Sequence, residues 1–339
     1  MKIAFHLTVP KPPRPELDAA VQDVMKLMCC VDGVINYLYP GKEVKRWIPR
    51  FLSGCHQVLY LLRLDNCVDV HHVFSNGLYP YPILLLLRKP VVCTSVIGVG
   101  NVSPRTSRFL KRFFKRVIVT APSDTDTLDS LGFESEFLYP GIDIDRFAFN
   151  KASSREDFTL LVGSAPWTED QFVSKGVDLV LQAAAQLPWL RLVFLWRGKL
   201  LSEMHERVEK YGVADSVHII AEQVDVDTVL KNVHAALVVV DKSDVIKSFP
   251  HSLLESLAAG KPVIVSAEVP IADFVKQNNC GVLVECFEIE CLVTSIKELK
   301  NNYDLFLESV SQTDMNVFSS EKMVNSYLDI YAKICGHPS

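Results

Sequence analysis

Short runs of apolar and β-branched residues recur along the whole chain, and longer segments with helical periodicity separate them. In the N-terminal half the clearest runs are Ile3–Leu7, Val68–Phe74, Val91–Ser95 and Val117–Thr120. In the C-terminal half they are Thr159–Val162, Leu192–Leu195, Val217–Ile220, Ala236–Val240, Val263–Ser266 and Gly281–Val284. Most are continuously apolar, as expected of strands covered on both faces. The intervening helical patterns include Val177–Gln186, Ser202–Tyr211 and Ser252–Ala259. This alternation predicts an α/β protein with doubly wound parallel sheets.

The chain is long enough for two such sheets. Its 339 residues exceed the length of roughly 250–300 residues at which a single core stops growing. The best linker candidate is Asn150–Asp157, which holds two serines and four charged side chains. We therefore expect one domain over residues 1–150 and a second over residues 151–315. Because open parallel sheets bind ligands at the carboxyl ends of their strands, we expect a ligand in a cleft between two facing domains.

Glycine is scarce, and this limits the kind of phosphate site that the chain can build. It contributes 15 of 339 residues, and neither a P-loop nor a complete GxGxxG is present. The nearest approach is Gly98-Val99-Gly100, but Ser103 stands where the third glycine would be. A phosphate bound by this chain is therefore not expected in a glycine-rich loop of the usual kind.

Charge and cysteine usage exclude several classes of protein. The net charge is −5, so the chain as a whole has no expected affinity for nucleic acid. Residues 1–150 hold 18 basic and 14 acidic side chains, whereas residues 151–339 hold 17 and 26, which suggests different partners for the two halves. The nine cysteines form no CxxC pair and no zinc-like spacing, so reduced thiols and no metal site are expected.

Targeting signals are also not apparent. The longest apolar run, Leu78 to Leu87, contains two prolines and is too short to span a bilayer. Lys2–Val9 is followed at once by prolines and charges, so it is interpreted as a first strand and not as a signal peptide. The expected location is the cytoplasm, with a peripheral contact to the inner face of the membrane left open.

The segment from Lys247 to Ile264, KSFPHSLLESLAAGKPVI, is the most informative in the chain. It predicts a turn at Pro250, a helix, a stop at Gly260-Lys261-Pro262 and a buried strand. A helix that starts near Pro250 or Ser252 presents backbone N–H groups with no partner inside the helix, and these can hold an anion. Glu255 would lie one turn further on, within reach of such a ligand. An ordinary surface glutamate is the alternative interpretation, with about equal weight on physical grounds.

This segment resembles the signature of glycosyltransferases of the large family 4, which have the GT-B fold of two Rossmann-like domains facing a central cleft. Four further segments are similar to elements of that family in the same order. They are Leu160–Gly163, Lys175–Asp178 with Ala183-Ala184, Leu138–Phe147 and Phe318–Val324 with Tyr327 and Tyr331. The resemblance implies that residues 1–150 bind the acceptor and residues 151–315 bind a nucleotide sugar. It also implies that residues 316–339 form a helix that crosses back to the first domain.

The resemblance also implies roles for particular residues. Lys175 is the counterpart of a lysine that contacts the donor diphosphate, and an ammonium is a compact charge suited to phosphate oxygens. Glu255 is the counterpart of a glutamate that accepts hydrogen bonds from the ribose hydroxyls. Lys175 and Glu255 are therefore the catalytic candidates. Donor contacts are also expected from Gly163, Lys247, Ser248, Phe249, Pro250, His251, Ser252 and Leu253. A solvated lysine before a helix is the alternative for Lys175.

Three departures from the family pattern affect these expectations. Lys247 stands where a glutamate usually grips the transferred sugar, so either the sugar differs or this contact is lost. Ser164 replaces the usual arginine after the opening glycine of the second domain. Its hydroxyl and the nearby amides would then hold phosphate, and Arg197, at the end of a strand, is a further donor-binding candidate. Ile97 precedes Gly98 where many members have a histidine.

Two acceptor-side candidates remain in the N-terminal half. Gly98 follows the Val91–Ser95 strand, and His72 follows Asp69-Val70 at an expected strand end. A satisfied core histidine is the favoured interpretation of His72. The first loop, Pro10–Pro15, stands where the family often has a glycine-rich loop that approaches the acceptor and the donor phosphates. A proline-rich loop is stiffer and has few backbone N–H donors, so we do not assign that role to it.

A basic segment in the N-terminal half has helical spacing. Arg105, Arg108, Lys111, Arg112, Lys115 and Arg116 alternate with phenylalanine and leucine side chains. Such a helix can present cations to anionic lipid headgroups. An amphipathic surface helix without this role is the slightly favoured alternative.

Taken with the resemblance, these residues predict a glycosyltransferase of the hexosyltransferase class that works in polysaccharide or glycolipid synthesis. It would move a sugar, with retention, from a UDP- or GDP-sugar to a glycan or lipid-linked acceptor, with no cofactor and no metal. Two alternatives stay open. One is a non-catalytic GT-B protein that binds a nucleotide sugar or a partner, and the other is a nucleotide-sugar epimerase.

Overall fold

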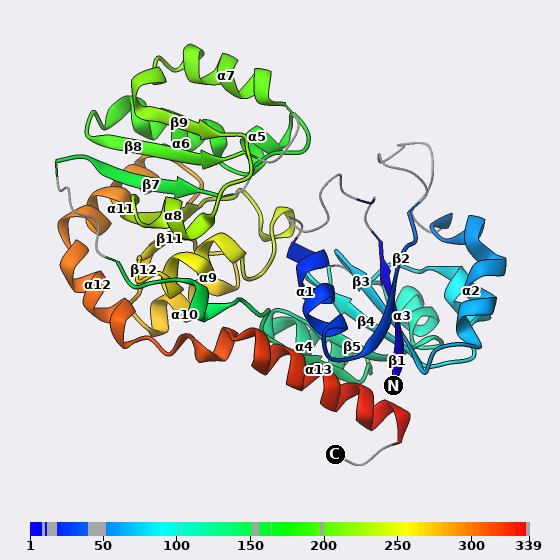
Figure 1. Ribbon diagram of the computed structural model, residues 1–339. Coiled ribbons are helices and arrows are strands. Elements are labelled where there is room, and N and C mark those ends of the chain that lie inside the picture. Colours follow the sequence, from blue (N-terminus) through cyan, green and yellow to red (C-terminus); the bar gives the residue numbers. More distant parts are fainter. Residues whose placement is uncertain are drawn as a thin grey trace. The chain divides into compact units, whose positions relative to one another are not determined.

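The computed structural model describes residues 1–8, 11, 19–39, 52–100, 102–150, 156–163, 165–196 and 200–336, apart from the side chains of residues 19 and 20. The chain forms two compact units. Unit 1 consists of Met1–Gly141 together with Phe318–Ser339, and unit 2 of Ile142–Val317. Each has its own sheet, as Figure 1 shows, and its own hydrophobic core.

Unit 1 is built on a six-stranded sheet with the order β2-β1-β3-β4-β5-β6. All neighbouring strands pair in parallel. The strands are β1 (Lys2–Leu7), β2 (Asp32–Tyr37), β3 (Val70–Ser75), β4 (Val91–Ser95), β5 (Phe114–Val119) and β6 (Ser135–Phe137). The helices are α1 (Ala19–Met28), α2 (Val58–Asp65), α3 (Pro104–Leu110), α4 (Pro122–Ser130) and α13 (Ser320–Cys335), with short 3₁₀ turns at Cys55–Gln57 (η3) and Pro82–Leu86 (η4).

Two hydrophobic clusters cover the two faces of this sheet. On one face, α1 and the C-terminal helix α13 pack against β1 and β3, with Tyr327 and Tyr331 of α13 in the cluster. Figure 1 shows α13, in red, running beside α1. On the other face, α3, α4 and η4 pack against β4 and β5. The last helix of the chain is therefore part of the core of unit 1.

Unit 2 is built on a second six-stranded parallel sheet, with the order β12-β11-β10-β7-β8-β9. Its strands are β7 (Phe158–Val162), β8 (Leu190–Leu195), β9 (Val217–Ile220), β10 (Ala235–Val238), β11 (Val263–Ser266) and β12 (Gly281–Val284). Its helices are α5 (Gln171–Ser174), α6 (Val177–Gln186), α7 (Leu201–Lys210), α8 (Val226–Leu230), α9 (His251–Ala258), α10 (Ile271–Gln277), α11 (Ile289–Asn301) and α12 (Tyr303–Gln312). Short 3₁₀ turns lie at Ile144–Arg146, Ala214–Ser216, Ser243–Val245 and Met315–Phe318.

The order in which strands are added to this parallel sheet reverses between β7 and β10. The chain proceeds outward through β7, β8 and β9, and then returns to the other side of β7 to form β10, β11 and β12. In doubly wound sheets the loops at the carboxyl ends of the two strands at such a point form a crevice that binds ligands. The loops after β7 and β10 are therefore where a site in unit 2 is expected.

Two expectations from the sequence are wrong. The helical pattern through Arg105–Arg116 breaks: α3 ends at Leu110, and β5 begins at Phe114. Lys115 and Arg116 therefore lie on a strand, because β5 must extend to Phe114 to pair with Val91 of β4. The second concerns the cysteines. Cys286 and Cys291 form a disulfide, since the turn from β12 into α11 brings their Cα atoms to 6.0 Å.

Within the described residues, no helix is long and apolar enough to cross a membrane.

Candidate functional site

The carboxyl end of β7 is in direct contact with the start of α9. A Cβ atom added at Gly163, the residue after β7, would lie 2.5 Å from the Cβ of Ser252 and 2.9 Å from its Oγ. Only glycine permits this approach, because real Cβ atoms do not come so close. Gly163 thus allows the first turn of α9 to lie over the end of β7.

The start of α9 has the features of an anion site. Pro250 caps the helix in an extended conformation, and its carbonyl accepts the N–H groups of Leu253 at 3.0 Å and Leu254 at 3.2 Å. The amides of His251 and Ser252 therefore occupy the two positions at which a helix supplies no acceptor. The predicted helix start near Pro250 or Ser252 is confirmed. The partial positive charge of the helix terminus adds to these donors.

Lys175 contacts the loop that follows Gly163, the residue that lies against this helix start. Its Nζ donates to the carbonyl oxygen of Ala165 at 3.3 Å. Within the described part of the chain it has no carboxylate partner, and burial lowers its pKa to about 8. An added Cβ at Gly176, whose φ is +67°, would lie 2.6 Å from the carbonyl oxygen of Val239, just after β10. Lys175-Gly176 is therefore held at the end of β10 while Gly163 marks the end of β7.

The residues between β10 and α9 form the rest of this loop. Ser248, Phe249 and Pro250 are buried, whereas Lys247 is half-buried. The Oγ of Ser248 is buried without a hydrogen-bond partner among the described residues, although its carbonyl accepts from the amide of Ile271 at 3.1 Å. Leu253 belongs to the core, and Glu255 is half-buried one turn into α9. Ser164 and Arg197 lie outside the described residues.

The structure therefore brings together Gly163, Lys175 and Ser252 at the switch point of unit 2. Chemically, this arrangement offers an ammonium group and the N-terminus of a helix to one anion, which suits a phosphate or diphosphate. Among the described residues, no three His, Cys, Asp or Glu side chains are placed to hold a metal ion.

Sequence reasoning missed three polar or aromatic features of unit 2. Lys261 is fully buried, its Nζ has no partner within the described residues, and burial lowers its pKa to about 8. Trp196 is buried at the end of β8, and its Nε1 also has no partner there. Trp167, two residues beyond Ala165, is 55% exposed and offers a flat apolar surface beside the loop. The unpaired polar atoms depend on tertiary packing, so no sequence pattern marks them.

The two acceptor-side candidates of unit 1 lie in different surroundings. The sequence suggested that His72 lies at a strand end. In the structure it is fully buried inside β3, because β3 continues to Ser75. Its Nε2 contacts the Thr94 hydroxyl at 2.7 Å, its Nδ1 contacts the Tyr331 hydroxyl, and burial lowers its pKa to about 3. Both ring nitrogens are thus occupied within the core.

Gly98, in contrast, lies at the carboxyl edge of the unit 1 sheet, just after β4. Its carbonyl accepts from the Ser95 hydroxyl at 2.6 Å, and an added Cβ would lie 3.5 Å from Oδ2 of Asp124 in the first turn of α4. Burial raises the pKa of the Asp124 carboxyl. Asp124 is a polar group at this edge that sequence reasoning did not single out.

Comparison with known proteins gives a family match over most of unit 2. Residues 170–313 match the family described as glycosyl transferases group 1. The matched segment covers less than half of the chain and lies within unit 2. It contains Lys175 and all of α9, so the two main parts of the candidate site fall inside it.

Two curated relatives are glycosyltransferases. The chain is 27% identical over 202 residues to the D-inositol 3-phosphate glycosyltransferase of Mycobacteroides abscessus, covering 54% of this chain and 44% of the relative. It is 26% identical over 161 residues to the lipopolysaccharide core biosynthesis glycosyltransferase LpsE of Rhizobium meliloti, covering 47% and 46%. The chain therefore spans less than half the length of the curated relatives that it matches.

Solved structures establish the fold class. HepE of Anabaena, solved in complex with UDP and also with UDP and glucose, matches with a TM-score of 0.74 at 16% identity. The match covers 98% of this chain and 100% of HepE. The prediction of an α/β protein with the GT-B fold is confirmed.

Proposed function

We propose that the protein is a glycosyltransferase that moves a sugar from a nucleotide sugar to a glycan or lipid-linked acceptor, with retention. The observation that carries the proposal is the contact between Gly163 and the start of α9, with Lys175 beside it, at the switch point of unit 2. The group 1 family match and the names of both curated relatives support it.

The donor would bind to unit 2 through its diphosphate. In this arrangement Lys175 and the amides of His251 and Ser252 contact the phosphate oxygens, Ser248 offers its unpaired hydroxyl, and Glu255 accepts from the ribose. As the bond to the sugar breaks, negative charge grows on the leaving diphosphate, and these fixed donors stabilise it. Lys247 cannot accept a sugar hydroxyl proton, so the sugar is held differently from the family pattern. No metal or other cofactor is needed for this step.

A UDP-sugar is the favoured donor, with a GDP-sugar as the alternative, because HepE is bound to UDP in its crystal structures. Unit 1 would bind the acceptor at its carboxyl edge, near Gly98. The names of the relatives favour an acceptor in glycolipid or polysaccharide synthesis. A cytoplasmic location, with a peripheral contact to the inner face of a membrane, fits such an acceptor.

Thermal unfolding in the presence of a panel of nucleotide sugars tests donor binding. At a concentration of one hundred times Kd, a ligand stabilises the folded protein by about 2.7 kcal/mol, which raises Tm by a few degrees. We expect one UDP- or GDP-sugar to raise Tm and the others to have little effect. Absence of stabilisation by every member of the panel, together with no effect of UDP or GDP, would contradict a donor site in unit 2.

The low pKa of Lys175 predicts how UDP affinity depends on pH. Burial holds this pKa near 8 in the free protein, whereas a bound diphosphate favours the protonated form. Affinity should therefore be highest below pH 8 and fall above it, by up to about tenfold per pH unit. In Lys175→Arg the guanidinium stays charged, so the fall should disappear. Calorimetric titration with UDP at several pH values measures this.

Lys261 titrates in the same range and provides the matched control for this experiment. Its Nζ is buried, so Lys261→Met keeps the side chain's length without its charge. We expect Lys261→Met to retain the wild-type fall in affinity. If the fall vanished in Lys261→Met and persisted in Lys175→Arg, Lys175 would not be the diphosphate contact.

The non-catalytic alternative is kept because Lys247 stands in the place of the sugar-gripping glutamate. Such a protein would show the same stabilisation by a nucleotide sugar but no release of nucleoside diphosphate from any donor.

A further inference from the structure

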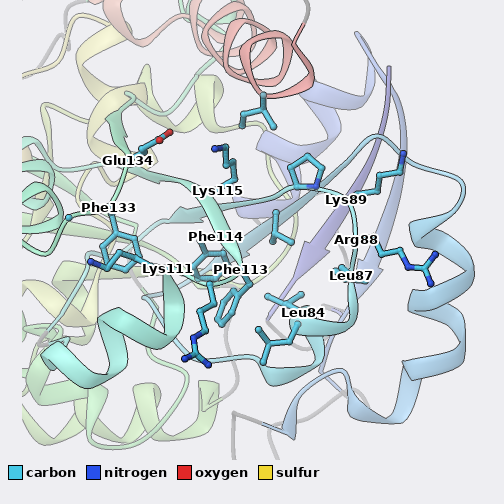
Figure 2. A pocket seen from close by; sticks show the side chains of 16 residues that line it. Leu84, Leu87, Arg88, Lys89, Lys111, Phe113, Phe114, Lys115, Phe133 and Glu134 are labelled. Atoms are coloured by element: carbon cyan, nitrogen blue, oxygen red, sulfur yellow. The ribbon is translucent and has the colours of Figure 1, made fainter.

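A hollow of about 600 Å³ lies at the edge of the unit 1 sheet where strands begin. Its lining includes Val91 and Phe114, the first residues of β4 and β5, and Glu134, which directly precedes β6. In Figure 2, Lys111 and Lys115 lie on one side of it and Arg88 and Lys89 on the other, with Phe113 and Phe114 between them. Gly98 follows the opposite end of β4, so this hollow is at the far edge from the acceptor-side candidate.

The lining has a strong excess of positive charge. It holds five basic side chains (Arg88, Lys89, Lys111, Arg112 and Lys115) and one acidic one, Glu134. The Glu134 carboxylate already accepts a hydrogen bond from Arg116 at 3.1 Å, so it does not neutralise the five. Arg112 and Lys115 are exposed, and within the described residues their side chains pair with no carboxylate. A rim of uncompensated cations attracts a polyanion or an anionic surface.

The same hollow is apolar at its base and at one lip. Phe113 and Phe133 are buried at 8% and 7% exposure and belong to the core cluster beneath it. At the lip, Leu85 is 45% exposed, and the adjacent Leu86 is 48% exposed. The cations alone would be enough to bind a small polar anion. The exposed leucines would gain free energy only by contact with an apolar part of the ligand. The combination fits an amphiphilic anion better than a purely polar one.

We propose that this hollow is a docking site for the headgroups of anionic phospholipids, which holds unit 1 against a membrane surface. Arg112 and Lys115 donate to the headgroup phosphate oxygens, while Leu85 and Leu86 enter the boundary between headgroups and acyl chains. The site replaces the single basic helix expected from the sequence, because Arg116 is paired with Glu134 and Glu136. Of the other cations of that segment, Lys111, Arg112 and Lys115 line the hollow. It does not depend on the donor site of unit 2.

Sedimentation of the full chain with vesicles tests the proposal. Vesicles of equal parts phosphatidylcholine and phosphatidylglycerol should bind the protein, and vesicles of phosphatidylcholine should bind it far more weakly. Each surface cation contributes roughly fivefold to the affinity for an anionic membrane, so Arg112→Ala/Lys115→Ala should bind about 30-fold more weakly. The matched control, Lys276→Ala/Lys297→Ala, removes two exposed lysines from unit 2 and should bind like the wild type.

A second pair of variants tests the apolar part of the site. Leu85→Ser/Leu86→Ser keeps every cation and changes only exposed side chains, so the fold is retained. It should bind the anionic vesicles about tenfold more weakly. Thermal stabilisation by nucleotides should be the same in all these variants, which separates this proposal from that of the donor site.

Three results would overturn the assignment. The first is equal vesicle binding by the wild type and Arg112→Ala/Lys115→Ala, and the second is equal losses in that variant and in the unit 2 control. The third is binding of inorganic phosphate, lost in Arg112→Ala/Lys115→Ala, with no binding to anionic vesicles. That outcome would make the hollow a site for a soluble phosphate compound and not for a membrane.

Discussion

Lys175→Ala should lower kcat for sugar transfer by roughly 10²–10³-fold, the usual effect of removing one donor that stabilises a developing negative charge. Lys175 contacts the loop after Gly163, since its Nζ donates to the Ala165 carbonyl. In the free protein that contact is its one hydrogen bond among the described residues, so the ammonium can turn to a ligand at little cost. Steady-state kinetics with the donor found by thermal unfolding measures the effect.

The control for Lys175→Ala is Lys276→Ala on α10, an exposed lysine of the same unit. It should have wild-type kinetics, and both variants should unfold at a similar temperature. Lys175→Arg should recover part of the activity, because it restores the charge but not the compact ammonium. Wild-type turnover in Lys175→Ala would remove this lysine from the site.

Gly163→Ala should be the second strongly affected variant. The new Cβ would lie 2.5 Å from the Cβ of Ser252, so the start of α9 must move away from the end of β7. Overpacking of this kind destabilises a domain by about 1–3 kcal/mol. Displacing donors by about 1 Å can also cost roughly 10²-fold in catalysis. Thermal unfolding and UDP titration measure the two effects separately.

A compensating substitution makes this test specific. Ser252→Gly removes both atoms that the new Cβ would meet, and the next atom, the Cα of residue 252, lies at 3.9 Å, an ordinary contact distance. The double variant Gly163→Ala/Ser252→Gly should therefore regain much of the stability and UDP affinity lost in Gly163→Ala. Absence of any recovery would show that the contact between β7 and α9 is not what Gly163 provides.

The sequence predicted most strands well because each contains a run of apolar residues. Val91–Ser95, Val217–Ile220, Val263–Ser266 and Gly281–Val284 have the bounds that the structure gives. It missed β2 and β6, the two edge strands of unit 1. β2 is mostly half-buried and begins with Asp32-Gly33, and β6 is only three residues long, so neither has a continuous apolar run.

The basic segment shows where local periodicity fails. Phe109, Leu110, Phe113 and Phe114 repeat at helical spacing, but Phe114 pairs with Val91 as part of strand β5. Local spacing could not reveal this pairing, because it joins residues more than twenty positions apart. The hollow around Lys111–Lys115 therefore could not be seen in the sequence, although its cations could.

Within the site, the resemblance supplied Gly163, Lys175 and the start of α9, and the structure supplied their contacts. The clash distance at Gly163, the Ala165 carbonyl under Lys175 and the unpaired Oγ of Ser248 all depend on how separate segments pack. The disulfide between Cys286 and Cys291 was missed for the same reason, because a spacing of five residues does not reveal the turn that joins them.

The most direct test of the central claim is product analysis after incubation of the protein with the stabilising nucleotide sugar and candidate glycan or glycolipid acceptors. Our account predicts release of the nucleoside diphosphate together with a glycosylated acceptor in the retained configuration, strongly reduced in Lys175→Ala. Donor that binds but is recovered unchanged with every acceptor would contradict it and indicate a non-catalytic binding protein. Donor converted to an isomer without an acceptor would also contradict it, in favour of an epimerase.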